Sequence, residues 1–379
     1  MSTYPPERPA LLRGKGLSVW DDEGREYLDM FAGIAVSSLG HAHEAVVRAV
    51  SEQVATIAHA SNLFVTEPAV RLAERLLEAT GMHRVFFANS GAEANEAAIK
   101  IARKWGSARG GRYEILTCFH GFHGRTIATL TATAQPKYQE GFGPLLEGFK
   151  YVAYGSIDAV LGAIGPKTAA VLVEPIQGEG GVTAPPDGFL RALRELCDEH
   201  DLLLMLDEIQ SGLGRTGWLY AYMAEGVRPD VFTTAKGLGA GIPIGACLVN
   251  ERADVFVPGD HGSTFGGNPV ACAAANAVLD VVNTDEFLAG VREVAGYLDE
   301  RLHGLAAGSA KVKELRGRGL LRGIALHEPA APIVAATRER GVIIGSAGPD
   351  TLRIAPPLIC RKEHVDRLVD ALGPSLVAD

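Results

Sequence analysis

Short apolar runs alternate along the chain with segments in which apolar residues recur at helical spacing. Residues 84–88, 168–174 and 202–207 are runs of the first kind, and the segment 190–197 between the last two has a helical pattern. Strands that are apolar on both faces and joined through helices form parallel sheets. The pattern therefore predicts an α/β fold in which ligands bind at the carboxyl ends of the strands.

The two ends of the chain differ in character from its centre. The segment 16–29 has the order strand, turn rich in aspartate and glycine, and strand, which predicts a β-hairpin. Helical patterns and short strand-like runs, among them 351–355, follow the central part. We therefore predict a large domain over 46–284 and a smaller α+β domain built from residues 1–45 and 285–379.

The composition is that of an ordinary globular protein. The 379 residues are 47% hydrophobic and 21% charged, and the net charge of −9 argues against nucleic acid or an anionic membrane as the main partner. No apolar run approaches the roughly 20 residues of a membrane-spanning helix. The five cysteines are odd in number and well separated, which indicates reduced thiols. We expect a soluble cytoplasmic enzyme.

The most informative local pattern is an acid at one strand end and a lysine after the next strand. Asp207 follows the apolar run 202–206, and Lys236 follows a strand-like run at 231–234 and precedes several glycines. A lysine amine can form a Schiff base with pyridoxal 5′-phosphate, and an acid can keep its pyridine nitrogen protonated so that the ring accepts electrons. Each residue alone fits an ordinary strand end, but together they favour a pyridoxal-phosphate site.

The segment after the strand at 84–88 suits a phosphate group. Ser90 and Glu93 have the spacing of a capping box at the start of an alanine-rich helix. Gly91 lets the backbone approach a ligand, and the free N–H groups and dipole of a helix N-terminus attract an anion. A capping box by itself predicts only a capped helix; beside Lys236 it favours a phosphate site.

An aromatic residue and an arginine lie close together in the segment 119–126. Phe122 precedes Arg125 by three residues; an aromatic ring can stack on a pyridine ring, and a guanidinium can bind a carboxylate with two bonds. The alternative for Arg125 is a surface ion pair. His120 and His123 raise the question of a metal ion, but no acidic or cysteine ligand has suitable spacing. We expect no metal.

Two further loops carry charged or hydroxyl side chains. Glu174 and Glu179 lie in a loop rich in glycine, and buried glutamates need partners such as arginine. Arg353 lies in a short apolar strand, an unusual place for an arginine, but sequence spacing does not establish that it pairs with Glu179. Ser263 and Thr264 lie between glycines, where hydroxyls can donate to phosphate oxygens.

Taken in order, these motifs resemble the class-III, or ω-type, aminotransferases of the fold-type-I pyridoxal-phosphate enzymes. The resemblance covers nearly the whole chain and is most specific in five segments: Asn-Ser-Gly-Ala-Glu-Ala-Asn-Glu at 89–96, Phe-His-Gly-Arg at 122–125, Glu-Pro-Ile-Gln-Gly-Glu-Gly-Gly at 174–181, Asp-Glu-Ile-Gln-Ser-Gly-Leu-Gly-Arg-Thr-Gly at 207–217 and Thr-Ala-Lys-Gly-Leu-Gly at 234–239. It implies a large domain with a mostly parallel seven-stranded sheet flanked by helices. It also implies a homodimer with active sites shared between the subunits.

The resemblance implies a role in cofactor binding for each matching residue. Lys236 would form the Schiff base and later move the proton between the substrate and the cofactor. Asp207 would bind the pyridine nitrogen and Gln210 the phenolic oxygen, with Ile209 and Phe122 on the two ring faces. The residues that would hold the phosphate are Ser90, Gly91 and Ala92, joined by Thr264 from the other subunit.

The resemblance also implies how two substrates are bound. Within the class, the chain is most similar to the acetylornithine aminotransferases, which implies N-acetylornithine as amino donor and 2-oxoglutarate as acceptor. Arg125 would bind the carboxylate of the donor, and Arg353 the α-carboxylate of 2-oxoglutarate. Glu179 would screen Arg353 during the donor half-reaction, and Ser263 is a further candidate substrate contact.

The chain departs from the family pattern at three places. Glu44 stands where proline commonly follows His43, Phe265 stands where tyrosine is usual, and the segment 327–335 is short. The sequence leaves several alternatives open: ornithine, succinylornithine, 4-aminobutyrate or a lysine-pathway intermediate as donor, a mutase or racemase on the same scaffold, and a binding module in which Lys236 is idle.

Overall fold

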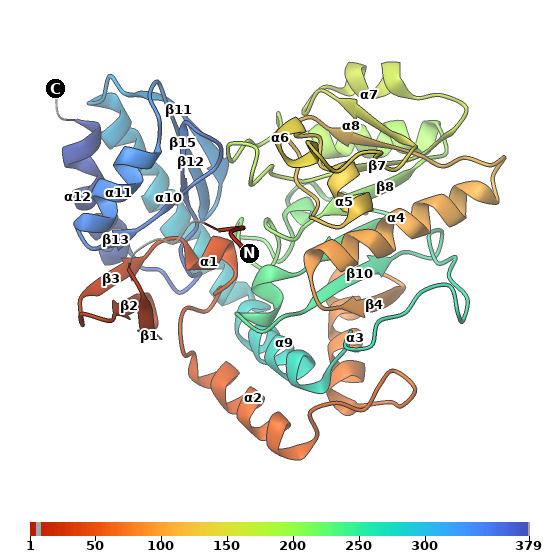
Figure 1. The fold of residues 1–379 in the computed structure, drawn as a ribbon, viewed down its shortest axis with the longest axis horizontal. Coiled ribbons are helices and arrows are strands. Elements are labelled where there is room, and N and C mark those ends of the chain that lie inside the picture. Colours follow the sequence, from red (N-terminus) through yellow and green to blue (C-terminus); the bar gives the residue numbers. More distant parts are fainter. Residues whose placement is uncertain (5–8, 378–379) are drawn as a thin grey trace.

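The part of the chain that the computed structural model describes, residues 1–4 and 9–377, contains a seven-stranded sheet and two four-stranded sheets. Helices cover both faces of the large sheet (Figure 1). In spatial order its strands are β4 (Arg84–Ala88), β10 (Gly245–Val249), β9 (Val231–Thr234), β8 (Leu203–Asp207), β7 (Thr168–Val173), β5 (Glu114–Cys118) and β6 (Phe149–Val152).

The large sheet is parallel except for β10, which runs antiparallel to both of its neighbours. The strands predicted at 84–88, 168–174 and 202–207 are confirmed to within one residue at each end, as β4, β7 and β8. Helix α8 (Phe189–Glu199) connects β7 to β8 and confirms the predicted β-α-β unit. The predicted α/β class with a mostly parallel seven-stranded sheet is therefore confirmed.

Alternate residues of the central strands belong to different apolar clusters on the two faces of the sheet. Leu203 and Met205 of β8 pack in a cluster with helix α4 (Gly91–Ser107), whereas Leu204 and Leu206 belong to the cluster that contains α8 and α9. Each leucine that is fully buried in this way stabilises the fold by about 1.5–3 kcal/mol. This double burial explains why the strand is a continuous apolar run and not an alternating one.

The N-terminal hairpin and a strand from the far end of the chain share a second sheet. Its order is β1 (Leu11–Lys15), β2 (Ser18–Asp21), β3 (Glu26–Asp29) and β13 (Val342–Ile343), and β13 pairs in parallel with β3. Figure 1 shows these strands beside the C-terminal helices. The predicted hairpin is confirmed as β2 and β3, and the sheet supports the proposal that both chain ends build one smaller domain.

A third sheet and its helices complete the C-terminal part of the chain. The strands, in spatial order, are β11 (Val312–Arg318), β12 (Leu321–Leu326), β15 (Thr351–Ile354) and β14 (Gly345–Ser346). The helices of this part are α10 (Asp285–Ala307), α11 (Ala331–Glu339) and α12 (Lys362–Leu376). Strand β15 brings Arg353 to the side of the large sheet at which β7, β8 and β9 end.

The remaining elements are α1 (Ala32–Ala35), α2 (Glu44–Thr56), α3 (Glu67–Thr80), α5 (Ile127–Ala132), α6 (Pro136–Gln139), α7 (Ile157–Ala163), α9 (Pro269–Val282) and the 3-10 helices η1 (Ala221–Glu225) and η2 (Lys236–Gly239). Glu44 is the first residue of α2, where an acidic side chain interacts favourably with the helix dipole.

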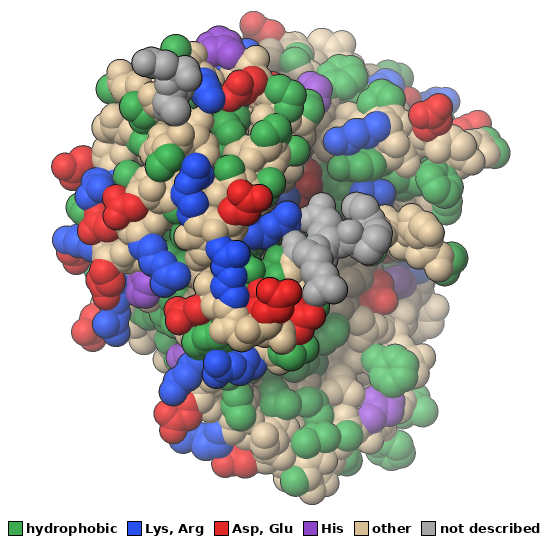
Figure 2. Space-filling model, turned by 60° about the vertical axis from the view of Figure 1, so that its left-hand side comes forward, with side chains coloured by type: hydrophobic (Ala, Val, Ile, Leu, Met, Phe, Trp, Pro, Cys, Tyr) green, Lys and Arg blue, Asp and Glu red, His purple; other side chains and the backbone are tan. Residues whose placement is uncertain are grey.

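None of the described helices is long and apolar enough to cross a membrane. Figure 2 shows acidic and basic side chains interspersed on the face that the C-terminal elements form.

Candidate active site

Three adjacent parallel strands end at the same edge of the large sheet, and each has a charged side chain at its last residue or shortly after it. Asp207 is the last residue of β8, Glu174 follows β7, and Lys236 begins η2 just after β9. A cavity of about 420 Å³ lies at this edge, within the range of small-molecule sites. The predicted site residues in its lining are Ser90, Gly91, Ala92, Phe122, Arg125, Asp207, Ile209, Gln210 and Lys236.

Asp207 is held by three hydrogen bonds. Its Oδ2 lies 2.8 Å from Nδ1 of His123 and accepts a bond of 2.8 Å from Nδ2 of Asn95, and its Oδ1 accepts a bond of 3.1 Å from the backbone N–H of Ile209. Asn95 in turn accepts a bond of 2.7 Å from the hydroxyl of Thr233. Burial opposes the charged form of His123, but its hydrogen bond to Asp207 and the charge of Asp207 outweigh this and raise the pKa of His123. The network fixes the direction of a buried carboxylate.

Lys236 occupies a strained backbone position at the edge of the cavity. Its φ is +39°, a value that non-glycine residues rarely adopt and that concentrates at functional sites. The residue is half-buried, and desolvation of its amine lowers the pKa of that amine against the attraction of Glu179. A larger fraction of the amine is therefore neutral at a given pH than in an exposed lysine, and a neutral amine is the form that acts as nucleophile or base.

The N-terminus of α4 opens onto the same cavity. Ser90 is the N-cap, and its Oγ accepts a bond of 3.2 Å from the N–H of Glu93. In a complete capping box the Glu93 carboxylate would accept a hydrogen bond from the backbone N–H of Ser90, and this part of the prediction is wrong. The carboxylate accepts instead from the backbone N–H of Asn89, at 2.7 Å, one residue earlier in the loop. At Gly91 a Cβ would lie 2.7 Å from Cδ1 of Ile209, so only glycine leaves this approach open. The first N–H groups of the helix lack intrahelical acceptors and can bind an anion.

Arg125 lies at the exposed mouth of the cavity, against two aromatic rings. Its guanidinium carbon is 4.0 Å from the ring centre of Tyr138 and 5.5 Å from that of Phe122. The rings orient the arginine without neutralising it.

Glu174 is held by backbone groups of two loops. Its carboxylate accepts a hydrogen bond of 2.9 Å from the backbone N–H of Phe122 and one of 3.3 Å from that of Gly178. Burial raises the pKa of Glu174 to about 7, against the opposing effect of the nearby imidazole.

Glu179 and Arg353 form an ion pair beside the cavity. One guanidinium nitrogen donates to Oε1 of Glu179, and Nη2 donates to Oε2 over 3.4 Å. The side chain of Arg353 is only 3% exposed and that of Glu179 20%. Arg353 also donates to Oε1 of Gln210 over 3.3 Å. Burial raises the pKa of Glu179, but the charge of Arg353 and its hydrogen bond outweigh this and lower it. The Glu179 carboxyl is therefore ionised at neutral pH.

Comparison with known proteins places the chain in a family. A family model described as class-III aminotransferases matches residues 4–376. The chain belongs to the class-III aminotransferases. It is 49% identical over 374 residues to an acetylornithine aminotransferase of Methanothermobacter thermautotrophicus, with 98% of this chain and 95% of that protein covered. It is 48% identical to the succinylornithine transaminase/acetylornithine aminotransferase of Pseudomonas aeruginosa, with 96% of this chain and 91% of that protein covered. Among solved structures it is similar to the ornithine aminotransferase of Toxoplasma gondii, with a TM-score of 0.96, 34% identity, and 100% of this chain and 92% of that chain covered.

Class-III aminotransferases use pyridoxal 5′-phosphate, and the residues at this edge of the sheet fit that cofactor. The cavity joins a helix N-terminus for a phosphate, a buried carboxylate for a ring nitrogen and a half-buried lysine for an aldehyde. The close approach of Ile209 to Gly91 lines one side of the cavity with an apolar surface suited to a ring. The assignment of individual residues to the parts of the cofactor stays a proposal.

Besides the ion pair of Glu179 and Arg353, two further predicted site residues of this aminotransferase lie outside the cavity. Ser263 accepts bonds from Nδ2 of Asn89 at 3.1 Å and from the N–H of Gly266 at 2.9 Å, and so supports the loop before α4. Thr264 is exposed and lines a separate cavity of about 210 Å³. The neighbouring Phe265 is also exposed, with its ring 5.2 Å from that of His59. A single chain does not bring Thr264 to Ser90, and its predicted contact from a second subunit stays a prediction.

Sequence reasoning missed two residues that hold the site together. Asn95 bonds to Asp207 and Thr233, and His123 was considered only as a metal ligand. A signal for Asn95 is present in the sequence, since it is a polar residue among the buried alanines of α4. Its partners lie on β8 and β9, more than a hundred positions along the chain, which spacing alone does not reveal.

Proposed function

We propose that this class-III aminotransferase transfers the terminal amino group of N2-acetyl-L-ornithine to 2-oxoglutarate, giving N-acetylglutamate 5-semialdehyde and L-glutamate. Such a reaction belongs to arginine biosynthesis, and we place it in the cytoplasm. The relatives named as acetylornithine aminotransferases support the choice of donor. The enzyme would act as a homodimer in which Thr264 of each subunit helps to bind the phosphate of the other.

The ion pair between Glu179 and Arg353 carries the proposal. The donor reacts at an amine far from its α-carboxylate, whereas the keto acid reacts at the carbon next to its α-carboxylate. An uncovered arginine near the reacting centre would favour α-amino acids and misplace the terminal amine. A carboxylate that neutralises Arg353 for the first half-reaction and leaves it for the second would resolve this conflict.

The other residues have roles that follow from their positions. Pyridoxal 5′-phosphate, when bound, supplies a ring that accepts the electron pair left when a proton leaves the donor carbon. Lys236 would take that proton on its amine and return it to the neighbouring acceptor position, because an amine with a lowered pKa is a suitable base. Asp207, fixed by His123 and Asn95, would hold the proton of the ring nitrogen. Arg125, at the mouth, would bind the donor carboxylate.

Single-turnover rates of the two half-reactions test the proposal. In Arg353→Lys, the 2-oxoglutarate half-reaction should slow by about tenfold to a hundredfold with little change in the donor half, because a lysine cannot reproduce the bidentate contact. In Arg125→Lys the donor half should slow instead. In Glu179→Ala, reactivity toward the α-amine of glutamate should rise relative to N-acetylornithine. Stopped-flow absorbance of the bound cofactor measures each rate.

The same measurement on the unchanged enzyme compares donors. N-acetylornithine should react faster than ornithine, succinylornithine and 4-aminobutyrate at equal concentration. A faster reaction with one of these three would assign the donor differently while leaving the aminotransferase chemistry in place. Equal losses in both half-reactions for all three variants would mean that the arginines only stabilise the fold, and the role of the ion pair would be refuted.

A further inference from the structure

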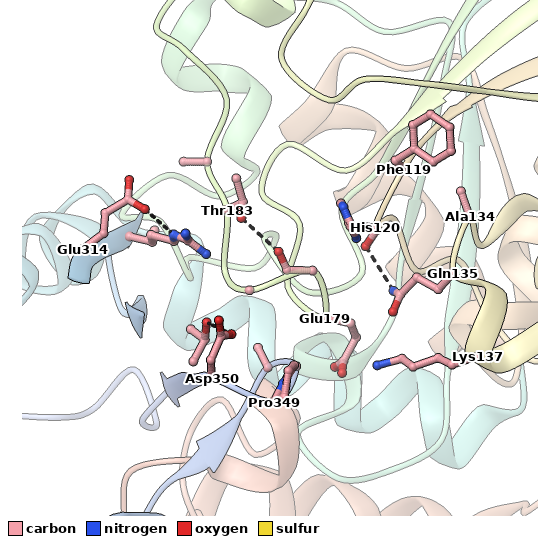
Figure 3. A pocket seen from close by; sticks show the side chains of 18 of the residues that line it. Phe119, His120, Ala134, Gln135, Lys137, Glu179, Thr183, Glu314, Pro349 and Asp350 are labelled. Carbon is pink, nitrogen blue, oxygen red and sulfur yellow. Dashed lines mark hydrogen bonds and ion pairs between the residues drawn. The ribbon is translucent and has the colours of Figure 1, made fainter. Parts of the chain in front are cut away.

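A cavity of about 830 Å³ lies on the outer side of the Glu179 loop. Its walls come from the loop around Glu179, the turn before β15, strand β11 and the segment that leads into α6. Both Glu179 and Lys137 line it, and Figure 3 shows the Lys137 side chain extending across the cavity toward the Glu179 carboxylate. This lysine is not among the residues assigned to the cofactor or to either substrate.

In the proposed function the ion pair has a closed state, in which Glu179 is bonded to Arg353, and an open state, in which Glu179 has moved away. The open state requires a new partner for the Glu179 carboxylate. In the closed state its carboxylate is mostly buried and bonded to Arg353. When the α-carboxylate of a substrate binds the Arg353 guanidinium, its negative charge approaches that of Glu179 in a site of low dielectric. The two charges repel each other unless Glu179 moves away. Glu179 stands between Gly178 and Gly180, where backbone rotation is least restricted. The outer cavity provides space for that movement.

Lys137 has the properties of such a partner. It is an exposed residue of α6, and in the described part of the chain its ammonium forms no ion pair or hydrogen bond. Its ammonium lies over the ring of Tyr138, with its nitrogen 4.6 Å from the ring centre. The same ring contacts Arg125, so the ammonium of Lys137 lies beside the mouth of the active site. Its charge is therefore available to a displaced carboxylate.

We propose that Lys137 binds the Glu179 carboxylate when the ion pair with Arg353 opens. The inference rests on the proposed function, in which Glu179 leaves Arg353 for the keto-acid half-reaction. Lys137 would act as a positioning residue, since it would stabilise the open state without touching the substrate. It would thereby favour the binding of dicarboxylates over that of the ω-amino donor.

Equilibrium binding of glutarate to the holoenzyme tests this role. Glutarate has the two carboxylates of 2-oxoglutarate and no reacting carbonyl, so calorimetry measures the opening of the ion pair without turnover. In Lys137→Met, glutarate should bind about two- to fivefold more weakly, the effect of losing one exposed ion pair. Lys137→Arg should restore binding. The matched control is Lys167→Met, which removes another exposed lysine beside a tyrosine ring and should leave the affinity unchanged.

A double-mutant cycle with Glu179→Gln separates the possible causes. In that background the displaced side chain carries no charge, and Lys137→Met should have no effect on glutarate affinity. A loss of equal size in both backgrounds would mean that Lys137 contacts the dicarboxylate directly and would overturn the proposal, as would an unchanged affinity in the single variant. The KM for 2-oxoglutarate should follow the glutarate affinity, while the donor half-reaction keeps its rate. A different preferred donor would refute the proposed substrate without altering these binding results.

Discussion

The Lys236→Ala variant should lose amine transfer almost completely, by at least about 10⁴-fold. The loss is this large because one amine is proposed to act both as nucleophile toward the cofactor and as the group that moves the proton. The contacts proposed for the phosphate and the ring do not involve this side chain, so pyridoxal 5′-phosphate should remain bound without a covalent bond. Steady-state formation of glutamate and the absorbance of the protein after gel filtration measure the two effects.

A second variant distinguishes chemistry from backbone strain at this position. Lys236 has φ of +39°, so alanine relieves no strain and adds little, whereas Lys236→Gly accommodates the backbone without a side chain. Both variants should be equally inactive, and added methylamine should restore part of the proton transfer. Substantial turnover by either variant without an added amine would withdraw the assignment of Lys236.

The Asp207→Ala variant should slow the proton-transfer step by several orders of magnitude. The buried carboxylate is proposed to keep the ring nitrogen protonated, and an unprotonated ring is a poor acceptor for electrons. The variant also leaves Asn95 and His123 without their acceptor, which destabilises the fold by about 1–3 kcal/mol. Single-turnover rates with N-acetylornithine measure the first effect, and urea unfolding measures the second.

Asp230 provides the matched control for Asp207. It is also a buried aspartate of the large sheet, 2% exposed, but it precedes β9 and pairs with Arg194 at the opposite end of the strands. Asp230→Asn should lower stability and leave the proton-transfer rate of the folded enzyme unchanged. If Asp207→Ala slowed the step by less than about tenfold, or roughly 1.4 kcal/mol, its role toward the ring nitrogen would be withdrawn.

The sheet and the two central site residues could be predicted because their signals are local. The strand that ends at Asp207 is a continuous apolar run, and Lys236 follows the next strand at a short distance. Parallel strands bring their carboxyl ends to one edge, so their approach follows from the fold class alone. The hairpin of β2 and β3 was equally local, since its turn residues lie between its strands.

Contacts between distant elements could not be predicted in this way. The pairing of Glu179 with Arg353 joins a loop to strand β15 across 174 positions of the chain, and only the placement of β15 beside the large sheet brings the two residues together. The capping box was wrong in one of its two bonds, because the turn at Asn89 depends on how β4 enters α4. Thr264 lies outside the cavity in the single chain. Its predicted contact with a second subunit stays a prediction, because no local sequence pattern encodes which surface would meet a partner.

The transfer of a labelled nitrogen tests the central claim most directly. The holoenzyme would be incubated with 2-oxoglutarate and N-acetylornithine that carries nitrogen-15 only at its terminal amine, and the products would be analysed by mass spectrometry. The account predicts that glutamate gains the label in equal amount to the semialdehyde formed, and that Lys236→Ala forms neither. Unlabelled glutamate, or consumption of N-acetylornithine without labelled glutamate, would contradict it.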